Sequence, residues 1–444
     1  TMSAAGLKSV AAFNDSDQFA VPDYISAHVE SVDISDDGRF VVATRTEVPV
    51  SALLVAPNVD ADNDRRPIGM PAPDLCRRAL STPRGFPELV RCVVPGDNVI
   101  IAVDPETPFL ADVLTAVCEH LQTVPDGGVS LTLLLPEDES GNSWQWLTDS
   151  LPLHLQQQMT IVSHLPSDQN QLSYLASSAA GERIYLNRLL TDADMIVSIG
   201  LLAFDGQLGV RGTTSVLFPA FSDEVTLRAA RSHGHSELTP EQQRPFRDLV
   251  DEIGWLLGTQ FTVQVIPGVG AAPTEIIAGL PDDVLQHGRE VLNRVFRILV
   301  REEVDAVVLS IPGGAAFGWR QLGHALEQAS HLINQGGRII VVADLPVPEG
   351  PAATMLRRCQ EPEDLLKPLR REPTSDAVEI AQLIETLRRA RVYLLSTLPP
   401  DVVEEMGMIP IADSAELQRL VAAVENRIVI PNANYAWCDV GVRV

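Results

Sequence analysis

After about residue 97, apolar and polar positions alternate along the chain in a pattern that predicts strands and helices in turn. Short apolar runs at 97–103, 129–135 and 192–200 are typical of buried strands, and apolar residues at helical spacing over 109–121 predict a helix. The earlier stretch 39–56 is also strand-like. Strands that alternate with helices favour a parallel sheet with helices on its faces, so we expect an α/β protein.

The best helical pattern in the chain lies at 238–258. Thr239 can cap this helix, Gln242 would complete a capping box, and Pro240 sits where a missing N–H costs little. Gly258 is expected to end the helix. Its predicted buried stripe consists of Phe246, Leu249, Val250, Ile253 and Leu257.

A second α/β unit is predicted towards the C-terminus. It contains a helix over 282–303, a strand over 305–314, a helix over 319–337 that ends at Gly336 and Gly337, and a strand over 338–344. This order is a βαβ unit, whose ligand site lies at the carboxyl ends of the strands. Pro312, Gly313 and Gly314 are therefore expected at one edge of a site and Asp344 at another.

The elements together predict two α/β domains with mainly parallel sheets and an interdomain cleft. We place the N-terminal domain at residues 1–272 and the C-terminal domain at 273–444. The last strand is expected to pack back on the N-terminal domain.

Composition and charge narrow the function classes. The chain has 33 basic and 59 acidic residues, for a net charge of −26, so it would repel nucleic acid and anionic membranes. No apolar run approaches the roughly 20 residues that span a bilayer, and the N-terminal stretch turns polar before a signal-peptide core could form. We therefore expect a cytoplasmic protein. Five scattered cysteines without a CxxC pair indicate small buried side chains rather than disulfides or a zinc site.

Several polar residues at predicted strand ends are candidates for chemistry. Asp104, Glu106 and Thr107 follow a strand and precede a helix, so they either cap the helix or contact a ligand. The segment 200–221 is rich in glycine, follows a buried strand, and has Arg211 as its single basic residue. Loops of this kind are where α/β enzymes hold charged ligands.

Histidines supply a second group of candidates. His233 and His235 stand two apart, and such a pair can ligate a metal when it is extended, although ordinary surface histidines share the pattern. His164 and Asp168 indicate a turn rather than catalysis. The sequence contains no Walker A motif, no G-x-G-x-x-G, no G-x-S-x-G and no HExxH.

The order of these segments resembles the nickel-pincer lactate racemase family. The resemblance is carried by "NVIIAVDPETPFLADVLTAVCEHL", "IVSHLPSDQNQ", "ERIYLNRLLTDADMIVSIG", "GQLGVRGTTSVLFP", "RSHGH", "DAVVLSIPGG", "GGRIIVVAD" and "RIVIPNANYAW". It implies a two-domain α/β enzyme that interconverts the stereoisomers of a 2-hydroxy acid. The implied cofactor is a nickel-pincer nucleotide bound covalently to a lysine, with one histidine on nickel and two others as acid and base.

The resemblance also assigns residues of the cofactor side. The family's aspartate matches Asp104, and the arginine three residues later corresponds to Thr107. The lysine that carries the pincer corresponds to Thr214, next to Ser215. Arg211 lies in the same loop, so the cofactor-binding residues would be Asp104, Thr107, Arg211, Thr214 and Ser215.

Catalytic and metal positions follow in the same way. The first acid/base histidine falls in 136–142, which contains no histidine, and the second falls on Asp205. His233 corresponds to the nickel ligand. The polar residues that face substrate in the second domain of the family correspond to Gly323 and Leu326.

Three hypotheses for function remain. The first is a divergent family member that has lost covalent pincer attachment and lactate racemisation. It would bind a small anionic metabolite, such as a 2-hydroxy acid, or a nucleotide through Arg211, backbone N–H groups and Asp104, or serve as a scaffold subunit. The second is an active nickel-dependent 2-hydroxyacid racemase or epimerase that holds the pincer noncovalently, with Asp205 as acid or base. The third is an unrelated zinc-dependent α/β hydrolase that uses His233 or His235. The missing lysine and histidines favour the first.

Overall fold

The computed structural model describes residues 24–27, 46–49, 70–125, 128–137, 144–179, 181–230, 238–268, 273–311 and 318–441. The chain divides into two compact units, one of residues 66–291 and one of residues 292–444 together with 1–65. This division falls inside α10 (Pro281–Val295), later than the predicted boundary at 272/273. The reason is that β12 (Glu275–Gly279) pairs with β11 (Phe261–Ile266) and so belongs to the sheet of the first unit.

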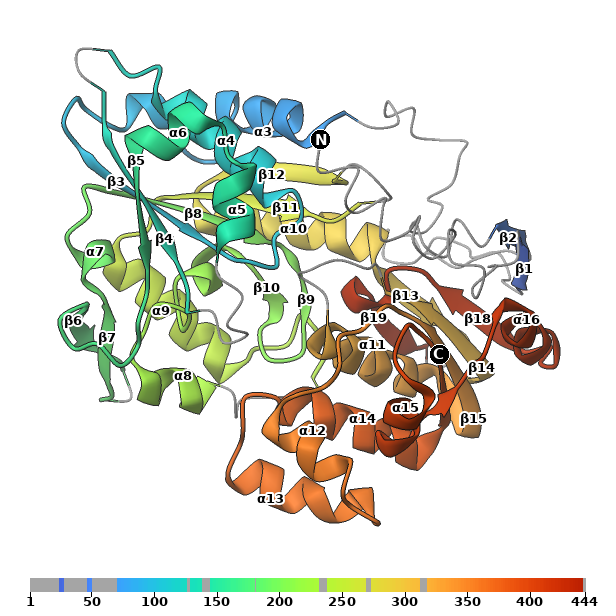
Figure 1. The fold of residues 1–444 in the computed structure, drawn as a ribbon. Helices are drawn as coiled ribbons and strands as arrows, with labels where there is room; N and C mark the ends of the chain where they lie inside the picture. The colour runs from blue at the N-terminus through green and yellow to red at the C-terminus, as the bar shows by residue number, and fades with distance from the viewer. Residues whose placement is uncertain are drawn as a thin grey trace. The chain divides into compact units, whose positions relative to one another are not determined.

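A six-stranded sheet forms the centre of the first unit (Figure 1). Its strand order is β12-β11-β8-β3-β4-β5, and every neighbouring pair is parallel except β11 and β12. The four strands not yet placed are β3 (Asn98–Val103), β4 (Ser130–Leu135), β5 (Met159–Ser163) and β8 (Met195–Leu201). The mainly parallel sheet predicted from the sequence is confirmed.

Shorter elements surround this sheet. Two antiparallel hairpins are formed by β6 (Leu172–Ser177) with β7 (Arg183–Asn187) and by β9 (Ala203–Asp205) with β10 (Gly209–Arg211). The helices are α3 (Ala72–Ser81), η1 (Leu89–Arg91), α4 (Leu110–Leu121), α5 (Gln145–Ser150), α6 (Leu153–Gln158), α7 (Arg188–Thr191), η2 (Thr213–Val216), α8 (Glu224–Ala230), α9 (Pro245–Leu257) and α10.

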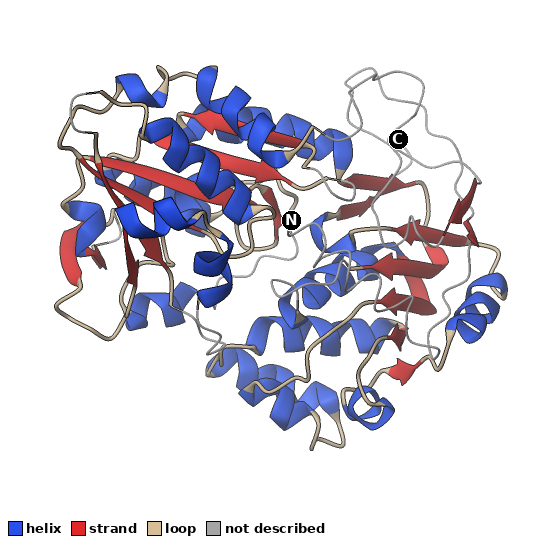
Figure 2. Ribbon diagram, turned by 45° about the horizontal axis from the view of Figure 1, so that its top comes forward, coloured by secondary structure: helices blue, strands red, loops and turns tan. Residues whose placement is uncertain are grey.

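Strand β3 shows why the apolar runs become central strands. Its side chains alternate between the two faces of the sheet, and both faces are covered, so all but the first residue are buried. Val99, Ile101 and Val103 pack with α3 and α4 in one core cluster, whereas Ile100 and Ala102 pack with Leu217 and Phe221 on the other face. Figure 2 shows helices on both sides of the strands.

The second unit is built on a five-stranded parallel sheet in the order β17-β16-β15-β14-β18. Its strands are β14 (Val304–Ser310), β15 (Ile333–Val342), β16 (Arg391–Leu395), β17 (Ile409–Pro410) and β18 (Arg427–Ile430). The predicted βαβ unit is present, with α11 (Trp319–Leu332) connecting β14 to β15. The other helices are α12 (Pro351–Leu356), η3 (Pro362–Leu365), α13 (Leu366–Arg371), α14 (Ala377–Arg389), α15 (Pro400–Glu405), α16 (Ser414–Ala422) and η4 (Ala433–Tyr435).

Two further strand pairs complete the described structure. The last strand, β19 (Trp437–Val440), pairs in parallel with β13 (Arg297–Val300) of the same unit. Near the N-terminus, β1 (Tyr24–Ala27) pairs antiparallel with β2 (Thr46–Pro49), and β1 packs against β18 and α16. Strand β2 lies within the strand-like stretch 39–56, the rest of which is outside the described residues.

Three predicted helix boundaries are wrong. Helix α9 begins at Pro245 rather than near Thr239, because the residue before a proline is pushed out of helical geometry and Arg244 is extended, with φ −128° and ψ 127°. Thr239 N–H does donate to Gln242 Oε1 over 2.7 Å, but this bond closes a turn. The predicted end at Gly258 is confirmed, with φ 73° at that glycine.

The other two errors concern helices that stop early. The helix predicted over 282–303 ends at Val295, and the apolar residues that follow form β13, which pairs with β19. The helix predicted over 319–337 ends at Leu332, and β15 already begins at Ile333. A short apolar run after a helix fits either structure, and pairing with a distant strand decides between them.

The cysteines and the lengths of the helices were both considered in the sequence analysis. All five cysteines are free; Cys76, Cys118 and Cys438 are buried, whereas Cys92 and Cys359 are half-buried. No helix in the described ranges is both long enough and apolar enough to cross a membrane.

Candidate functional site

The candidate site lies where the direction of strand addition reverses in the first sheet. After β3, the chain adds β4 and β5 on one side, and it later adds β8 and β11 on the other side. The carboxyl ends of β3 and β8 therefore flank a topological switch point, which is where open α/β sheets bind ligands. Asp104 follows β3, and the glycine-rich loop of β9, β10 and η2 follows β8.

An ion-pair cluster connects these two strand ends. Arg211, at the end of β10, donates from one guanidinium nitrogen to Asp104 Oδ2 over 2.7 Å and from another to Glu106 Oε2. The side chains are 15%, 12% and 19% exposed for Arg211, Asp104 and Glu106, so the cluster is largely shielded from water. The structure thus brings together three residues that the sequence singled out as candidates, Asp104, Glu106 and Arg211.

Burial alone would lower the pKa of Arg211, but the carboxylates of Asp104, Glu106 and Asp205 outweigh it and raise that pKa above its ordinary value. The guanidinium is therefore permanently charged and is surrounded by three carboxylates. Because negative charge is in excess around Arg211, the cluster does not present a free cation to an anionic ligand.

Asp104 and Thr107 do not cap the following helix. Helix α4 begins after Phe109, and no side chain caps it. Instead, Asp104 Oδ1 accepts from the N–H of Glu106 over 3.0 Å, and the Thr107 hydroxyl donates to the Asp104 carbonyl over 2.6 Å. The N-cap interpretation of this segment is therefore wrong, and its polar groups hold a tight turn that aims Asp104 and Glu106 at Arg211.

Asp205 and Ser215 each stabilise a turn of the loop. Asp205 Oδ1 accepts from the N–H groups of Gln207 and Leu208, both over 2.8 Å, and so closes the β9–β10 hairpin. Ser215 Oγ accepts from the N–H of Gly212 over 2.8 Å. Gly212 has φ 113°, a conformation open to glycine, and a Cβ there would lie 2.7 Å from Gln264 Oε1.

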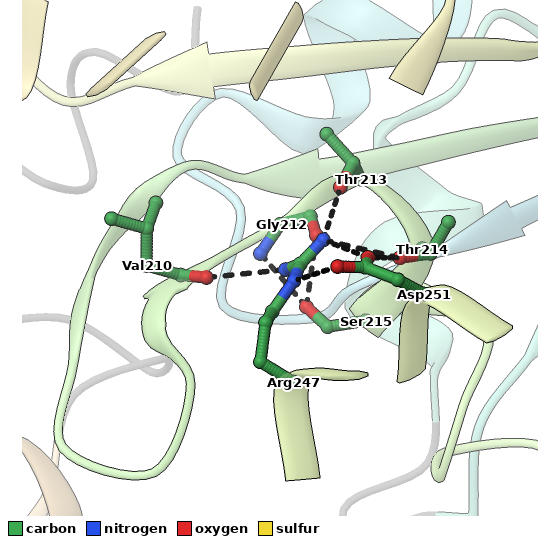
Figure 3. Close-up of polar contacts among 7 residues, drawn as sticks. All are labelled: Val210, Gly212, Thr213, Thr214, Ser215, Arg247 and Asp251. Carbon is green, nitrogen blue, oxygen red and sulfur yellow. Dashed lines mark hydrogen bonds and ion pairs between the residues drawn. The ribbon is translucent and has the colours of Figure 1, made fainter. Parts of the chain in front are cut away.

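Thr214 is held in a polar network with helix α9 (Figure 3). Its hydroxyl donates to Asp251 Oδ1 over 3.0 Å and accepts from Arg247 Nη2 over 3.3 Å. Arg247 also binds both carboxylate oxygens of Asp251, the Val210 carbonyl and the Thr213 hydroxyl. Thr214 is 6% exposed and Arg247 is 5% exposed. Sequence reasoning missed this network, whose one local signal is the i, i+4 spacing of Arg247 and Asp251 on a helix.

The same threonine packs directly against the backbone of α9. A Cβ placed on Gly254 would lie 2.2 Å from Thr214 Cγ2, so a glycine is required at the point where the loop meets the helix. The side chain at position 214 is therefore enclosed between Arg247, Asp251 and Gly254.

Histidines contribute little to the described site. His233 and His235 lie outside the described residues. His164 is fully buried, its Nε2 bonds the Ser222 carbonyl over 2.8 Å and its Nδ1 bonds the Asn187 amide over 2.9 Å. Burial lowers the pKa of His164, and the bond to Ser222 partly opposes that effect. Asp168 accepts from the N–H of Asn170, which confirms the predicted turn. Within the described ranges, no group of three or more His, Cys, Asp or Glu side chains is placed to hold a metal ion.

The fold and the site together define an α/β protein with a glycine-rich loop at the switch point of its first sheet. Residues 71–243 match the model of the lactate racemase N-terminal domain family. The match covers α3 to the turn before α9, and so includes Asp104, Arg211 and Thr214.

Two solved structures are similar to this chain in fold. The lactate racemase apoprotein of Thermoanaerobacterium thermosaccharolyticum matches with a TM-score of 0.72 and 16% identity, over 94% of this chain and 99% of that chain. A structural genomics target from Thermotoga maritima matches with a TM-score of 0.59 and 15% identity, over 83% of this chain and 98% of that chain. No curated protein matches the sequence significantly. The lactate-racemase-like α/β fold predicted from the sequence is confirmed.

The described residues do not fit a covalently bound pincer nucleotide. Thr214 has no amine, and its hydroxyl is occupied by Asp251 and Arg247. Lysine occurs in the chain only at positions 8 and 367, so residues 66–291 contain no lysine that could replace the one missing at position 214. A tether through lysine cannot form within this unit.

Proposed function

We propose that this chain is a divergent lactate racemase homologue that neither carries a covalent pincer cofactor nor racemises lactate. The observation that supports the proposal most directly is the enclosure of Thr214 between α9 and the loop, in a unit without lysine. The unit retains the family's loop at the switch point. The loop would therefore keep a role in binding, without the racemase chemistry of the family.

The charge balance at the switch point decides which ligands the loop favours. Arg211 already donates to Asp104 and Glu106, so an anion could reach it only by breaking at least one of these ion pairs. Breaking a largely buried pair costs several kcal/mol, more than a single carboxylate contact returns. We therefore propose that lactate and other 2-hydroxy acids bind weakly, and that the predicted use of Arg211 as an anion receptor is suppressed in this chain.

Intact-mass spectrometry tests the proposal. The chain is co-produced with the enzymes that synthesise the pincer nucleotide, and a lactate racemase produced in the same way is the positive control. We expect the mass of the unmodified chain, no stoichiometric nickel, and no racemisation of either lactate enantiomer. An adduct on a peptide from residues 66–291, or racemisation above the rate of the cofactor-free protein, would contradict the proposal.

A further inference from the structure

Strand β5 forms one edge of the sheet of the first unit (Figure 1). Among the described residues, β4 is the only strand that pairs with it, in an uninterrupted parallel register. The described elements in closest contact with β5 are β4 and α6, the helix that leads into it. The edge includes none of the residues on which the proposed function rests.

The register shows which backbone groups of β5 point outward. His164 N–H donates to the Leu135 carbonyl over 2.8 Å, and in a parallel ladder every second residue faces the same neighbouring strand. Residues 160, 162 and 164 therefore bond β4, whereas Ile161 and Ser163 direct their N–H and C=O groups away from it. Within the described part of the chain, these outward groups of Ile161 and Ser163 make no hydrogen bond.

The other edges of the two main sheets are protected. At the opposite edge of the same sheet, Arg84 N–H donates to the Ala278 carbonyl of β12 over 2.8 Å, and α3 packs against β12. In the second unit, β17 has only two residues, and β1 packs against β18. Strand β5 has five residues and none of the charges, prolines or bulges that normally protect an exposed edge. Such an edge is a template for pairing with a further strand.

The distribution of charge narrows the choice of partner. The chain has 33 basic and 59 acidic residues, yet no Asp, Glu, Lys or Arg occurs from 150 to 167, a stretch that includes α6 and β5. In antiparallel pairing about a two-fold axis, a strand faces its own copy, so a charge near the axis would meet a like charge. Two copies with a net charge of −26 each repel, and this repulsion is least where the surface in contact is uncharged.

We propose that β5 pairs with β5 of a second copy of this chain, antiparallel and about a two-fold axis at Val162. Ile161 of each copy would exchange two hydrogen bonds with Ser163 of the other copy, as directly opposed residues do in an antiparallel ladder. This register satisfies every outward N–H and C=O group of Ile161 and Ser163. Leu165, which is 47% exposed directly after β5, would lie opposite Met159 of the second copy and add apolar contact. The two sheets would then be continuous across the dimer.

Sedimentation equilibrium of the full chain, from low to high micromolar concentration, tests the pairing. We expect a monomer–dimer equilibrium for the parent chain. Ser163→Pro removes one outward N–H from each copy and leaves the bonds to β4 in place, so it should weaken dimerisation by at least about tenfold. Ser163→Ala is the matched control, because it removes the same exposed hydroxyl but keeps the N–H, and it should dimerise as the parent does.

Amide hydrogen exchange gives a second readout, and it decides the question on the parent chain alone if the proline variant fails to fold. The N–H groups of Ile161 and Ser163 should be protected at high protein concentration and should exchange faster on dilution. Those of Thr160 and Val162, which bond β4, should be protected at both concentrations and serve as the internal reference.

Four results would overturn the proposal. These are a parent chain that stays monomeric throughout, a folded Ser163→Pro variant that dimerises as tightly as the parent, and loss of the dimer in Ser163→Ala. The fourth is exchange at Ile161 and Ser163 that does not change with concentration, and protection of these amides in the monomer would assign the edge to a different chain.

Discussion

At the scale of single residues, Arg211 decides the character of the switch point. The sequence singles out Arg211 and Asp104 as candidates, but it contains no sign that they pair, because 107 residues separate them. Likewise, Thr214 could be recognised as a departure from the family, whereas its enclosure by Arg247 and Gly254 depends on how the loop packs on α9. The sequence could therefore predict which residues belong to the candidate site, but not which side chains they bond or pack against.

Replacement of Arg211 by methionine should destabilise the protein by about 3 kcal/mol at neutral pH, because it leaves Asp104 and Glu106 largely buried without their cation. The folded variant should then take up protons more readily than its unfolded chain, so its stability relative to the parent should recover as the pH falls towards about 4. Urea unfolding followed by circular dichroism at both pH values measures the change.

Glu106→Gln is the matched control for this experiment, since it keeps the ion pair between Arg211 and Asp104. Its loss of stability should be clearly smaller than that of the methionine variant. Equal stability of Arg211→Met and the parent chain at neutral pH would show that the cluster contributes nothing, and would remove the argument against anion binding.

At the scale of elements, the apolar runs predicted the central strands β3, β4 and β8 well, because strands buried on both faces need a nearly continuous apolar sequence. Helix boundaries were predicted less well. Pro245 overrides the capping signal at Thr239, and β13 takes residues that continue the apolar pattern of α10. Local signals compete at such points, and a proline or a distant strand decides the outcome.

The contact between α9 and the loop makes an unusual prediction for Gly254. Alanine in place of a helical glycine normally stabilises by about 1 kcal/mol. Here the added methyl would lie 2.2 Å from Thr214 Cγ2, so we expect Gly254→Ala to destabilise by about 1–3 kcal/mol through overpacking. Chemical denaturation of the purified variant provides the measurement.

Thr214→Ser removes the methyl group that collides and should restore part of the stability when combined with Gly254→Ala. The two substitutions must therefore be non-additive. If their effects simply add, or if Gly254→Ala stabilises the protein, position 214 does not pack against α9 as described.

At the scale of the whole molecule, the net charge of −26 sets how the protein responds to salt. Like charges spread over the surface repel in the compact state, and at 0.1 M salt the repulsion between exposed charges more than about 10 Å apart is largely screened. We expect the thermal midpoint to rise between low and moderate sodium chloride, as measured by differential scanning calorimetry. An uncharged osmolyte at equal osmolality controls for solvent effects, and a midpoint that falls with added salt would show that favourable ion pairs outweigh the repulsion.

The pairing that closes the first unit has a consequence for how the chain is organised. Helix α3, at the start of that unit, packs against β12 near its end, and Leu280 N–H donates to the Arg84 carbonyl over 2.9 Å. The two ends of the segment are thus tied to each other, while β1 and the residues from 292 onwards form the other unit. In the order of the chain, the first unit is therefore an insertion within the second, and its own two ends are joined. Such a unit can be exchanged during evolution, or circularly permuted by experiment, while its core stays intact.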